Sequence, residues 1–148
     1  MPPLDPADPD PDPPPPRVLL VMPEQWPRAL LRAALREVGY DALGAPGLAG
    51  ALRYRSEAQG RGPVRLVLVD QAVLQGDEDL SLLTTLLRRH EDPAAILLAR
   101  AMPMPRLSEK AEPAPWTRVI RRPVSIDGIV AAVRDLLPLP PGSSRPID

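Results

Sequence analysis

Short apolar segments alternate with amphipathic segments along the middle of this chain, and this alternation limits the fold more than any other feature. Residues 17–21 (RVLLV), 64–69 (VRLVLV) and 93–99 (PAAILLA) are typical of strands buried on both faces, because almost every position is apolar. Residues 40–46 (YDALGAP) and 116–121 (WTRVIR) indicate two further, weaker strands. The chain is therefore expected to contain a five-stranded sheet.

Between these strands, apolar residues recur every three or four positions, which is the spacing of amphipathic helices. The pattern predicts a first helix with Pro27 at its first position and Gly39 at its end. It also predicts a short helix at 48–55, a helix that ends near His90, and a last helix capped by Ser125. Five strands alternating with helices predict an α/β fold in which helices cover both faces of a parallel sheet.

Proline marks the segments that break this pattern. Residues 100–116 contain four prolines: Pro103, Pro105, Pro113 and Pro115. They leave one or two helical turns at most, so the fourth helix, between the last two strands, is predicted to be short or irregular. Residues 1–16 are mostly Pro and Asp, and they and residues 139–148 are predicted to be disordered tails around a domain at 17–138. The first tail is interpreted as a solubilising leader, with a docking arm as the alternative.

Composition excludes several classes of function. The chain has no Cys and one His, which excludes disulfides, cysteine nucleophiles and the usual zinc sites. No Ser lies in a G-x-S-x-G turn, and GAPGLAG lacks both dinucleotide-binding spacing and a P-loop Lys. We therefore predict no enzymatic activity, no metal and no cofactor. No segment is typical of a membrane span or a signal peptide, so a cytoplasmic location without membrane contact is the default expectation.

Charge and aromatic content do not favour nucleic-acid binding. The net charge is −1, and the four Asp of residues 1–16 leave the remainder at +3, which is mildly basic. Arg118 and Arg121 cluster with Arg122, but alternate residues of a strand face opposite ways, so the cluster is split. Trp26 and Trp116 are interpreted as partly buried packing groups, with anchors for a partner as the alternative. The sole histidine is expected at the surface near a helix C-terminus.

The order of these segments resembles the receiver domain of bacterial two-component response regulators, over residues 17–138. VLLVMPEQWPRALLRAALREVGY resembles the first strand and helix of the family, and LVLVD its third strand with the phosphorylatable aspartate, here Asp70. DPAAILLARA resembles the fourth strand, and VIRRPVS the fifth, with Arg122-Pro123 in place of a Lys-Pro pair. The resemblance implies a flavodoxin-like, doubly wound sheet of order 2-1-3-4-5 and a cis peptide bond before Pro123.

The same resemblance implies a phosphoryl-accepting pocket, but most of its partner residues are replaced. The family holds a divalent metal with two acids after the first strand, which neutralises charge as the phosphoryl group approaches the aspartate. Met22 and Pro23 occupy those positions, and neither is a ligand for a hard cation. Glu24 follows one position too late. The resemblance places Leu98 where the family has a hydroxyl residue at the end of the fourth strand, and Val119 where it has the aromatic switch residue.

Asp70 is therefore interpreted as a structural carboxylate that pairs with Arg122 or accepts local backbone amides. The preferred hypothesis is a phosphorylation-independent pseudo-receiver that acts as a protein-interaction module in bacterial signal transduction or assembly. One alternative is a phosphoaccepting receiver that uses Asp70 with Glu24. The other is a structural subunit of a larger complex.

The interaction surface is predicted around the proline-broken crossover and the last helix. Its residues are expected to be Met102, Met104, Leu107, Trp116 and Arg118. The expected partner is a protein, and a second copy of the chain, forming a homodimer, is one candidate.

Overall fold

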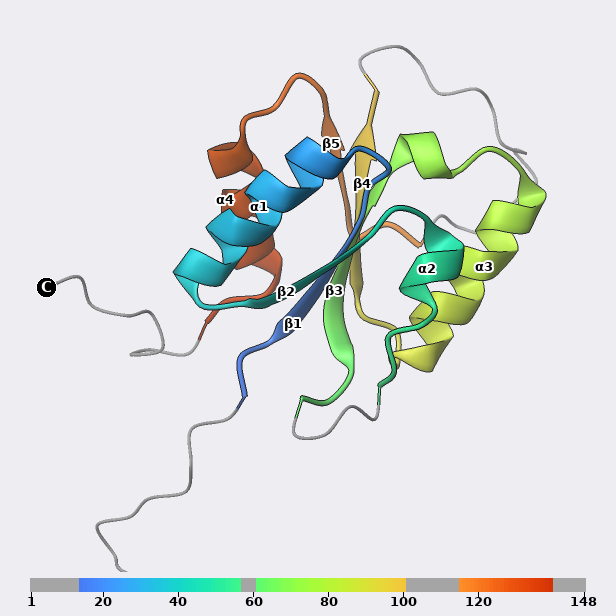
Figure 1. Ribbon diagram of the computed structural model, residues 1–148, viewed down its shortest axis with the longest axis horizontal. Helices are drawn as coiled ribbons and strands as arrows, with labels where there is room; N and C mark the ends of the chain where they lie inside the picture. The colour runs from blue at the N-terminus through green and yellow to red at the C-terminus, as the bar shows by residue number, and fades with distance from the viewer. Residues whose placement is uncertain (1–13, 57–60, 101–114, 140–148) are drawn as a thin grey trace, which may run out of the picture.

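The computed structural model describes residues 14–56, 61–100 and 115–139. Its five strands form one sheet in the order β2-β1-β3-β4-β5, and all four neighbouring pairs are parallel. The strands are β1 Arg17–Val21, β2 Asp41–Ala45, β3 Val64–Asp70, β4 Ala94–Ala99 and β5 Arg118–Arg121 (Figure 1). This confirms the α/β fold and the strand order that the resemblance implied.

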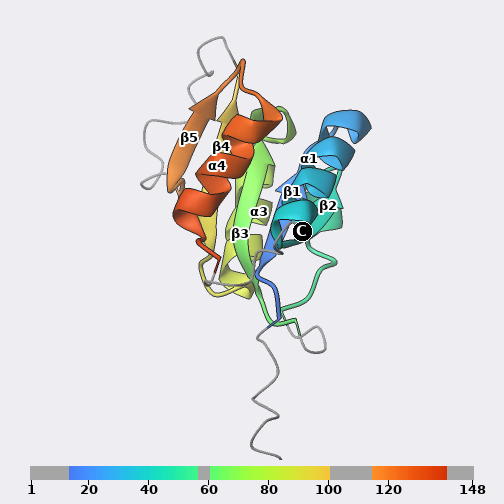
Figure 2. The same ribbon diagram turned by 90° about the vertical axis from the view of Figure 1, so that its left-hand side faces the viewer.

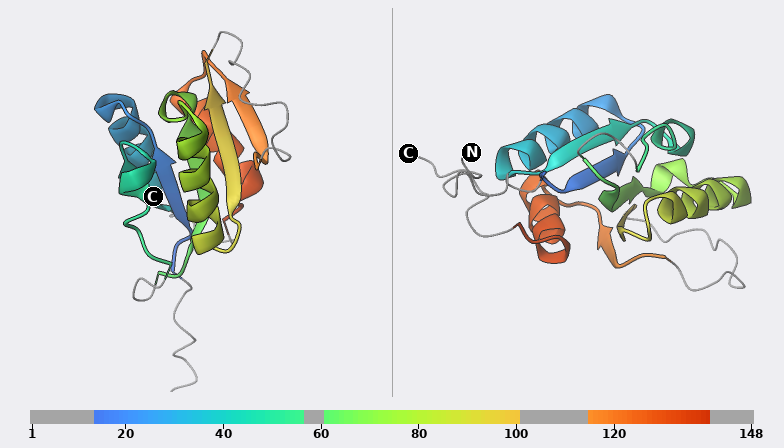
Figure 3. Two further views of the ribbon diagram at one scale, coloured as in Figure 1. Left: turned by 90° about the vertical axis from the view of Figure 1, so that its right-hand side faces the viewer. Right: turned by 90° about the horizontal axis from the view of Figure 1, so that it is seen from below.

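Helices cover the two faces of the sheet. They are α1 Gln25–Val38, α2 Leu48–Ala51, α3 Asp77–Arg89 and α4 Ile126–Leu136, with a 3₁₀ turn at Gln71–Val73. Figure 2 shows α1 and α4 on one face, and Figure 3 shows α2 and α3 on the other. The alternating side chains of β3 serve both layers, since Leu66 and Leu68 pack on the α1/α4 side while Val67 and Val69 pack on the α2/α3 side.

Local signals account for most of the helix ends. Gly39, at φ 125°, ends α1, and the Ser125 hydroxyl accepts the Gly128 N–H (3.0 Å) at the start of α4, both as predicted. The predicted start of α1 is wrong by two residues, because the helix begins at Gln25 and Pro27 is its third residue. A proline is tolerated there because N–H groups of the first turn have no partner within the helix.

The helix α2 is shorter than the predicted 48–55, and the hydrogen bonds made by the residues that follow it explain why. The Leu52 carbonyl, which a longer helix would bond internally, accepts a hydrogen bond from the Arg89 guanidinium instead. The Tyr54 hydroxyl donates to the Gly44 carbonyl (2.8 Å) on β2. These contacts hold the chain against the sheet and the end of α3 rather than in a further helical turn.

The two ends of the sheet are chemically different. The carboxyl end of the central strand β3 is Asp70, and the amino end of β1 is Arg17, and both residues are buried among apolar neighbours. The peptide bond between Arg122 and Pro123 is cis, as the resemblance implied. No helix in the described ranges is long and apolar enough to cross a membrane.

Three predicted features fall outside the described residues. They are the crossover helix within 100–116, most of the two predicted tails, and the three interaction residues Met102, Met104 and Leu107. Pro16, at the end of the first predicted tail, is described, and its carbonyl accepts the Asp41 N–H (2.9 Å).

Candidate functional site

Asp70 ends β3 and is nearly closed off from solvent, with 5% of its side chain exposed. Its Oδ1 accepts the backbone N–H of Ala72 (2.9 Å), which caps the 3₁₀ turn. Its Oδ2 accepts a hydrogen bond from Arg122 Nη2 (2.7 Å), a short, charge-assisted contact. Each carboxylate oxygen therefore has a partner, so both parts of the structural interpretation are present together.

Arg122 reaches Asp70 across the end of β4, because that strand lies between β3 and β5 in the sheet. The Arg122 backbone N–H donates to the Ala99 carbonyl (3.0 Å), which fixes the start of the side chain at the carboxyl end of β4. Its side chain is 35% exposed, so the ion pair has one buried and one partly solvated member. A buried carboxylate is costly without such a cation.

Other residues occupy the two positions at which receivers have the acidic ligands of the metal ion. The Met22 side chain is buried in the α1/α4 core, so its thioether does not face the Asp70 carboxylate as a free ligand. The Met22 carbonyl accepts a hydrogen bond from Arg28 Nη1 (2.6 Å), which brings a guanidinium to this end of β1. Pro23 is exposed and has no side-chain donor, and Glu24 is exposed at the N-cap of α1.

These residues do not fit a divalent cation. Hard cations need several oxygen ligands, whereas Asp70 is the one buried carboxylate here and both of its oxygens already have partners. The described residues contain no group of three or more His, Asp or Glu that could hold a metal ion. No step of a mechanism can be derived through a metal at this end of the sheet.

Leu98 and Val119 add no polar group to the pocket. Leu98 is paired with Asp70 in the sheet register and is 2% exposed, with its side chain in the apolar core. Val119 pairs with Leu97 on the edge strand β5 and is 45% exposed. Neither side chain can donate a hydrogen bond to a phosphoryl oxygen.

The arrangement of strands and helices is shared with several solved structures. A signal receiver domain of an HD-domain protein from Pseudomonas fluorescens Pf-5 is 23% identical, with a TM-score of 0.65, over 83% of this chain and 94% of that one. A CheY-like receiver domain protein from Methanospirillum hungatei JF-1 is 15% identical, with a TM-score of 0.61, over 82% and 92%. A receiver domain protein from Bacillus halodurans is 21% identical, with a TM-score of 0.59, over 84% and 99%.

The chain has the fold of a response regulator receiver domain. At these identities the likeness establishes the receiver fold alone, and the chemistry of the site follows from the residues of this chain. No family model matches the sequence, and no curated protein matches it.

Two aromatic residues of this receiver fold behave differently from each other. Trp116 is half-buried against the α2/α3 core, as its interpretation as a packing group predicted. Trp26 is 73% exposed, so the same interpretation is wrong for it. The reason is its place on α1, because that helix turns Leu31 and Leu35 toward the core and leaves Trp26 and Leu30 on the opposite side.

Arg118 lies on the edge strand and pairs with α4. Its Nη1 is 3.3 Å from Asp135 Oδ2, and both side chains are well exposed. An exposed pair of this kind contributes about 0–1 kcal/mol, so Arg118 remains available to a partner at little cost in stability.

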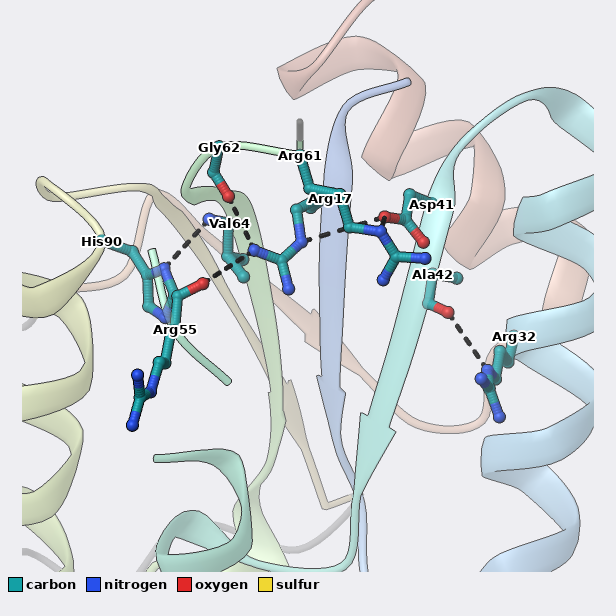
Figure 4. A network of polar contacts seen from close by, with 9 residues as sticks. All are labelled: Arg17, Arg32, Asp41, Ala42, Arg55, Arg61, Gly62, Val64 and His90. Atoms are coloured by element: carbon teal, nitrogen blue, oxygen red, sulfur yellow. Dashed lines mark hydrogen bonds and ion pairs between the residues drawn. The ribbon is translucent and has the colours of Figure 1, made fainter. Parts of the chain in front are cut away.

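The amino end of the sheet contains a buried polar network that the sequence did not indicate (Figure 4). His90 is 2% exposed, so its expected surface role is wrong. Its Nδ1 accepts the N–H of Val64 (3.0 Å), the first residue of β3. Burial lowers the pKa of His90, and the guanidinium groups of Arg17 and Arg89 lower it further against an opposing effect of the Tyr54 backbone. The imidazole is therefore neutral near pH 7 and acts as an acceptor.

Arg17 is the other buried member of this network, with 2% of its surface exposed. Its Nη1 donates to the carbonyl groups of Arg55 (2.9 Å) and Gly62 (2.6 Å), and its Nε lies 3.8 Å from Asp41 Oδ2 (Figure 4). Burial lowers the pKa of Arg17, while Asp41 raises it. The same Asp41 oxygen lies 3.6 Å from Arg61 Nε, so one carboxylate serves two guanidinium groups.

Proposed function

We propose that this chain is a degenerate member of the receiver family that acts as a protein-interaction module in bacterial signal transduction, without phosphorylation and without catalysis. Its proposed location is the cytoplasm. The observation that supports this most strongly is the engagement of both Asp70 oxygens, one by Ala72 and one by Arg122.

Phosphoryl transfer to Asp70 would require a carboxylate oxygen to approach an anionic phosphoryl group. Such an approach depends on positive charge and donors placed around the transferred group. Arg122 supplies one cation, but it already binds Oδ2 at 2.7 Å. Met22, Pro23 and Leu98 supply neither a hard-cation ligand nor a hydroxyl donor. The geometry therefore favours an ion pair that fixes the ends of β3 and β5.

Glu24 gives no support to the phosphoaccepting alternative. It is exposed at the N-cap of α1 and its side chain makes no capping hydrogen bond. It is not among the partners of Asp70 in the described residues.

The proposed interaction surface includes Trp116 and Arg118, with Met102, Met104 and Leu107 in the part of the chain outside the structure. Val119 faces the side of β5 opposite to Arg118 and is one of three large apolar side chains exposed in the described residues, so it supports the edge of the sheet, and not one face of it, as the surface. The other two, Trp26 and Leu30, lie on α1.

A phosphoryl mimic tests the proposal at Asp70. Amide spectra of the ¹⁵N-labelled chain are recorded with Mg²⁺, with and without beryllofluoride, and an authentic receiver domain in the same buffer shows that the reagent is active. The proposal predicts unchanged signals for Ala72 and its neighbours. A saturable shift at Ala72 that Asp70→Asn abolishes would favour the phosphoaccepting alternative.

Affinity capture tests the interaction half of the proposal. The Asp70→Asn chain should retain the proteins that the wild-type chain captures, because the proposed binding does not depend on phosphorylation. Arg118→Glu reverses an exposed charge and should release them with little loss of stability. Retention by Arg118→Glu with loss by Asp70→Asn would place the interface at the carboxyl end of the sheet and contradict the proposal.

A further inference from the structure

A hollow of about 590 Å³ opens at the amino end of the sheet, on the α2/α3 side. Three of its five lining residues are arginines: the lining consists of Leu52, Arg53, Arg55, Ser56 and Arg89. The segment 52–56 follows α2 on the way to β3, and Arg89 is the last residue of α3 on the way to β4. Among the described residues, three arginines, one serine and no acidic residue thus line this hollow.

The backbone of this hollow is fixed by three hydrogen bonds. The Arg89 guanidinium donates to the Leu52 carbonyl, and the Tyr54 hydroxyl donates to the Gly44 carbonyl (2.8 Å). The buried Arg17 donates to the Arg55 carbonyl (2.9 Å) from beneath (Figure 4). A ligand would therefore find the backbone that carries Arg53 and Arg55 already ordered, which lowers the entropic cost of binding.

In the described residues around the hollow, arginine side chains outnumber the carboxylates that pair with them. Asp41 is shared between Arg17 and Arg61. Within the described residues, none of Arg53, Arg55 and Arg89 lies in an ion pair with a carboxylate.

We propose that this hollow binds a small ligand that carries a diphosphate group. Arginine favours phosphate oxygens because its planar guanidinium offers paired N–H donors that match their geometry. A diphosphate carries more charge than a single phosphate and can contact guanidinium groups on both sides of the hollow. Leu52 is the sole apolar residue of the lining, so an attached organic group adds little to recognition.

The site is independent of Asp70, because it lies at the opposite end of the sheet. The seven residues of β3 separate the two ends by ~23 Å, at a strand rise of ~3.3 Å per residue. Diphosphate binding can therefore hold whether or not Asp70 accepts a phosphoryl group.

Calorimetric titration of the full chain with inorganic pyrophosphate tests the proposal. Wild-type protein should bind one equivalent with a saturable heat. The double variant Arg53→Gln, Arg55→Gln should bind about tenfold more weakly or worse, because two charge-assisted contacts are lost. A matched control, Arg36→Gln with Arg134→Gln, removes the same charge from exposed positions on α1 and α4 and should change affinity by less than about twofold.

Equal weakening in both double variants would mean binding to net charge alone and would overturn the proposal, as would heats that never saturate. Adenosine diphosphate is the second probe, and its affinity should lie within about threefold of that of pyrophosphate, since Leu52 offers little apolar contact. Binding of adenosine diphosphate without binding of pyrophosphate would overturn the assignment to the diphosphate group. Equal unfolding temperatures of the two double variants exclude loss of fold as the cause.

Discussion

At the carboxyl end of the sheet one buried carboxylate, Asp70, meets one guanidinium, Arg122, whereas at the amino end one buried guanidinium, Arg17, shares Asp41 with Arg61. At the first end both oxygens of the acid are bonded, and Arg28 adds a second guanidinium at the Met22 carbonyl. At the second end, three arginines line a hollow, and Arg17 holds the backbone of one of them, Arg55, by a hydrogen bond to its carbonyl. In open α/β sheets, ligands usually bind outside the carboxyl ends of the strands. Here the hollow lined by three arginines lies at the other end.

This contrast shows how a fold and its chemistry can separate. The receiver fold positions Asp70 at the end of β3 whatever surrounds it, because the strand register and the core fix that place. What the carboxylate can do depends on the side chains of Met22, Leu98 and Arg122. The fold accommodates all three side chains without any need for phosphoryl chemistry. Function has to be argued from those side chains and not from the sheet.

Arg17→Met gives the largest expected loss of stability and tests the amino end. It leaves the carbonyl groups of Arg55 and Gly62 without their donor and Asp41 without its buried partner, so the free energy of unfolding should fall by about 3 kcal/mol. Urea denaturation measures it. Arg61→Gln is the matched control, because Arg61 contacts the same carboxylate but is 54% exposed, and it should cost less than about 1 kcal/mol. Similar losses in the two variants would show that Arg17 does not anchor this end.

Arg122→Gln tests the carboxyl end and should have a smaller effect. Asp70 would remain buried without its cation, but Arg122 is 35% exposed and water can replace part of the lost contact, so we expect a loss of about 2 kcal/mol. Its neighbour Arg121, exposed and outside any ion pair in the described residues, is the control, and Arg121→Gln should be close to neutral. If Arg122→Gln is equally neutral in the same denaturation measurement, the ion pair does not hold Asp70.

His90 gives the smallest expected change in the free energy of unfolding, and the sign of that change can be checked by varying the pH. Burial lowers the pKa of His90 in the folded state below its usual value of 6.5, so between the two pKa values the unfolded chain binds more protons. The stability that neutral His90 supplies is complete above pH 6.5 and is lost as the pH falls toward the folded-state pKa. The free energy of unfolding should therefore be lower at about pH 5 than at about pH 7.5.

His90→Asn is the matched variant for this pH dependence. Its amide oxygen can accept the Val64 N–H in place of Nδ1, but it does not titrate, so the variant should show a flatter profile than wild type between the same two pH values. An identical slope in the two proteins would assign the pH dependence to other groups.

The sequence predicted the parts of the fold that depend on apolar periodicity. The strand segments, the Gly39 and Ser125 helix ends and the alternation of layers follow from local patterns that the core satisfies. At the site, the end of an apolar strand singled out Asp70, whereas Arg122 was identified from the resemblance to the Lys-Pro pair of the receiver family.

The buried polar residues at the amino end were not predictable in this way. Arg17 begins an apolar strand, where a charged residue would ordinarily reach solvent, and His90 ends a helix, where it would ordinarily be exposed. Their burial depends on carbonyl and amide groups that come from distant segments, Arg55 and Gly62 for one and Val64 for the other. Arg28 at the Met22 carbonyl was missed for the same reason, although Gly44, which leaves room for its side chain, was a usable signal.

Incubation of the full chain with acetyl phosphate and Mg²⁺, followed by intact-mass and peptide-mass measurement, tests the central claim most directly. The closed Asp70–Arg122 pair predicts no mass increase above that of the Asp70→Asn variant treated in parallel. A gain of one phosphoryl group that maps to Asp70 in the wild type and is absent from Asp70→Asn would contradict the account.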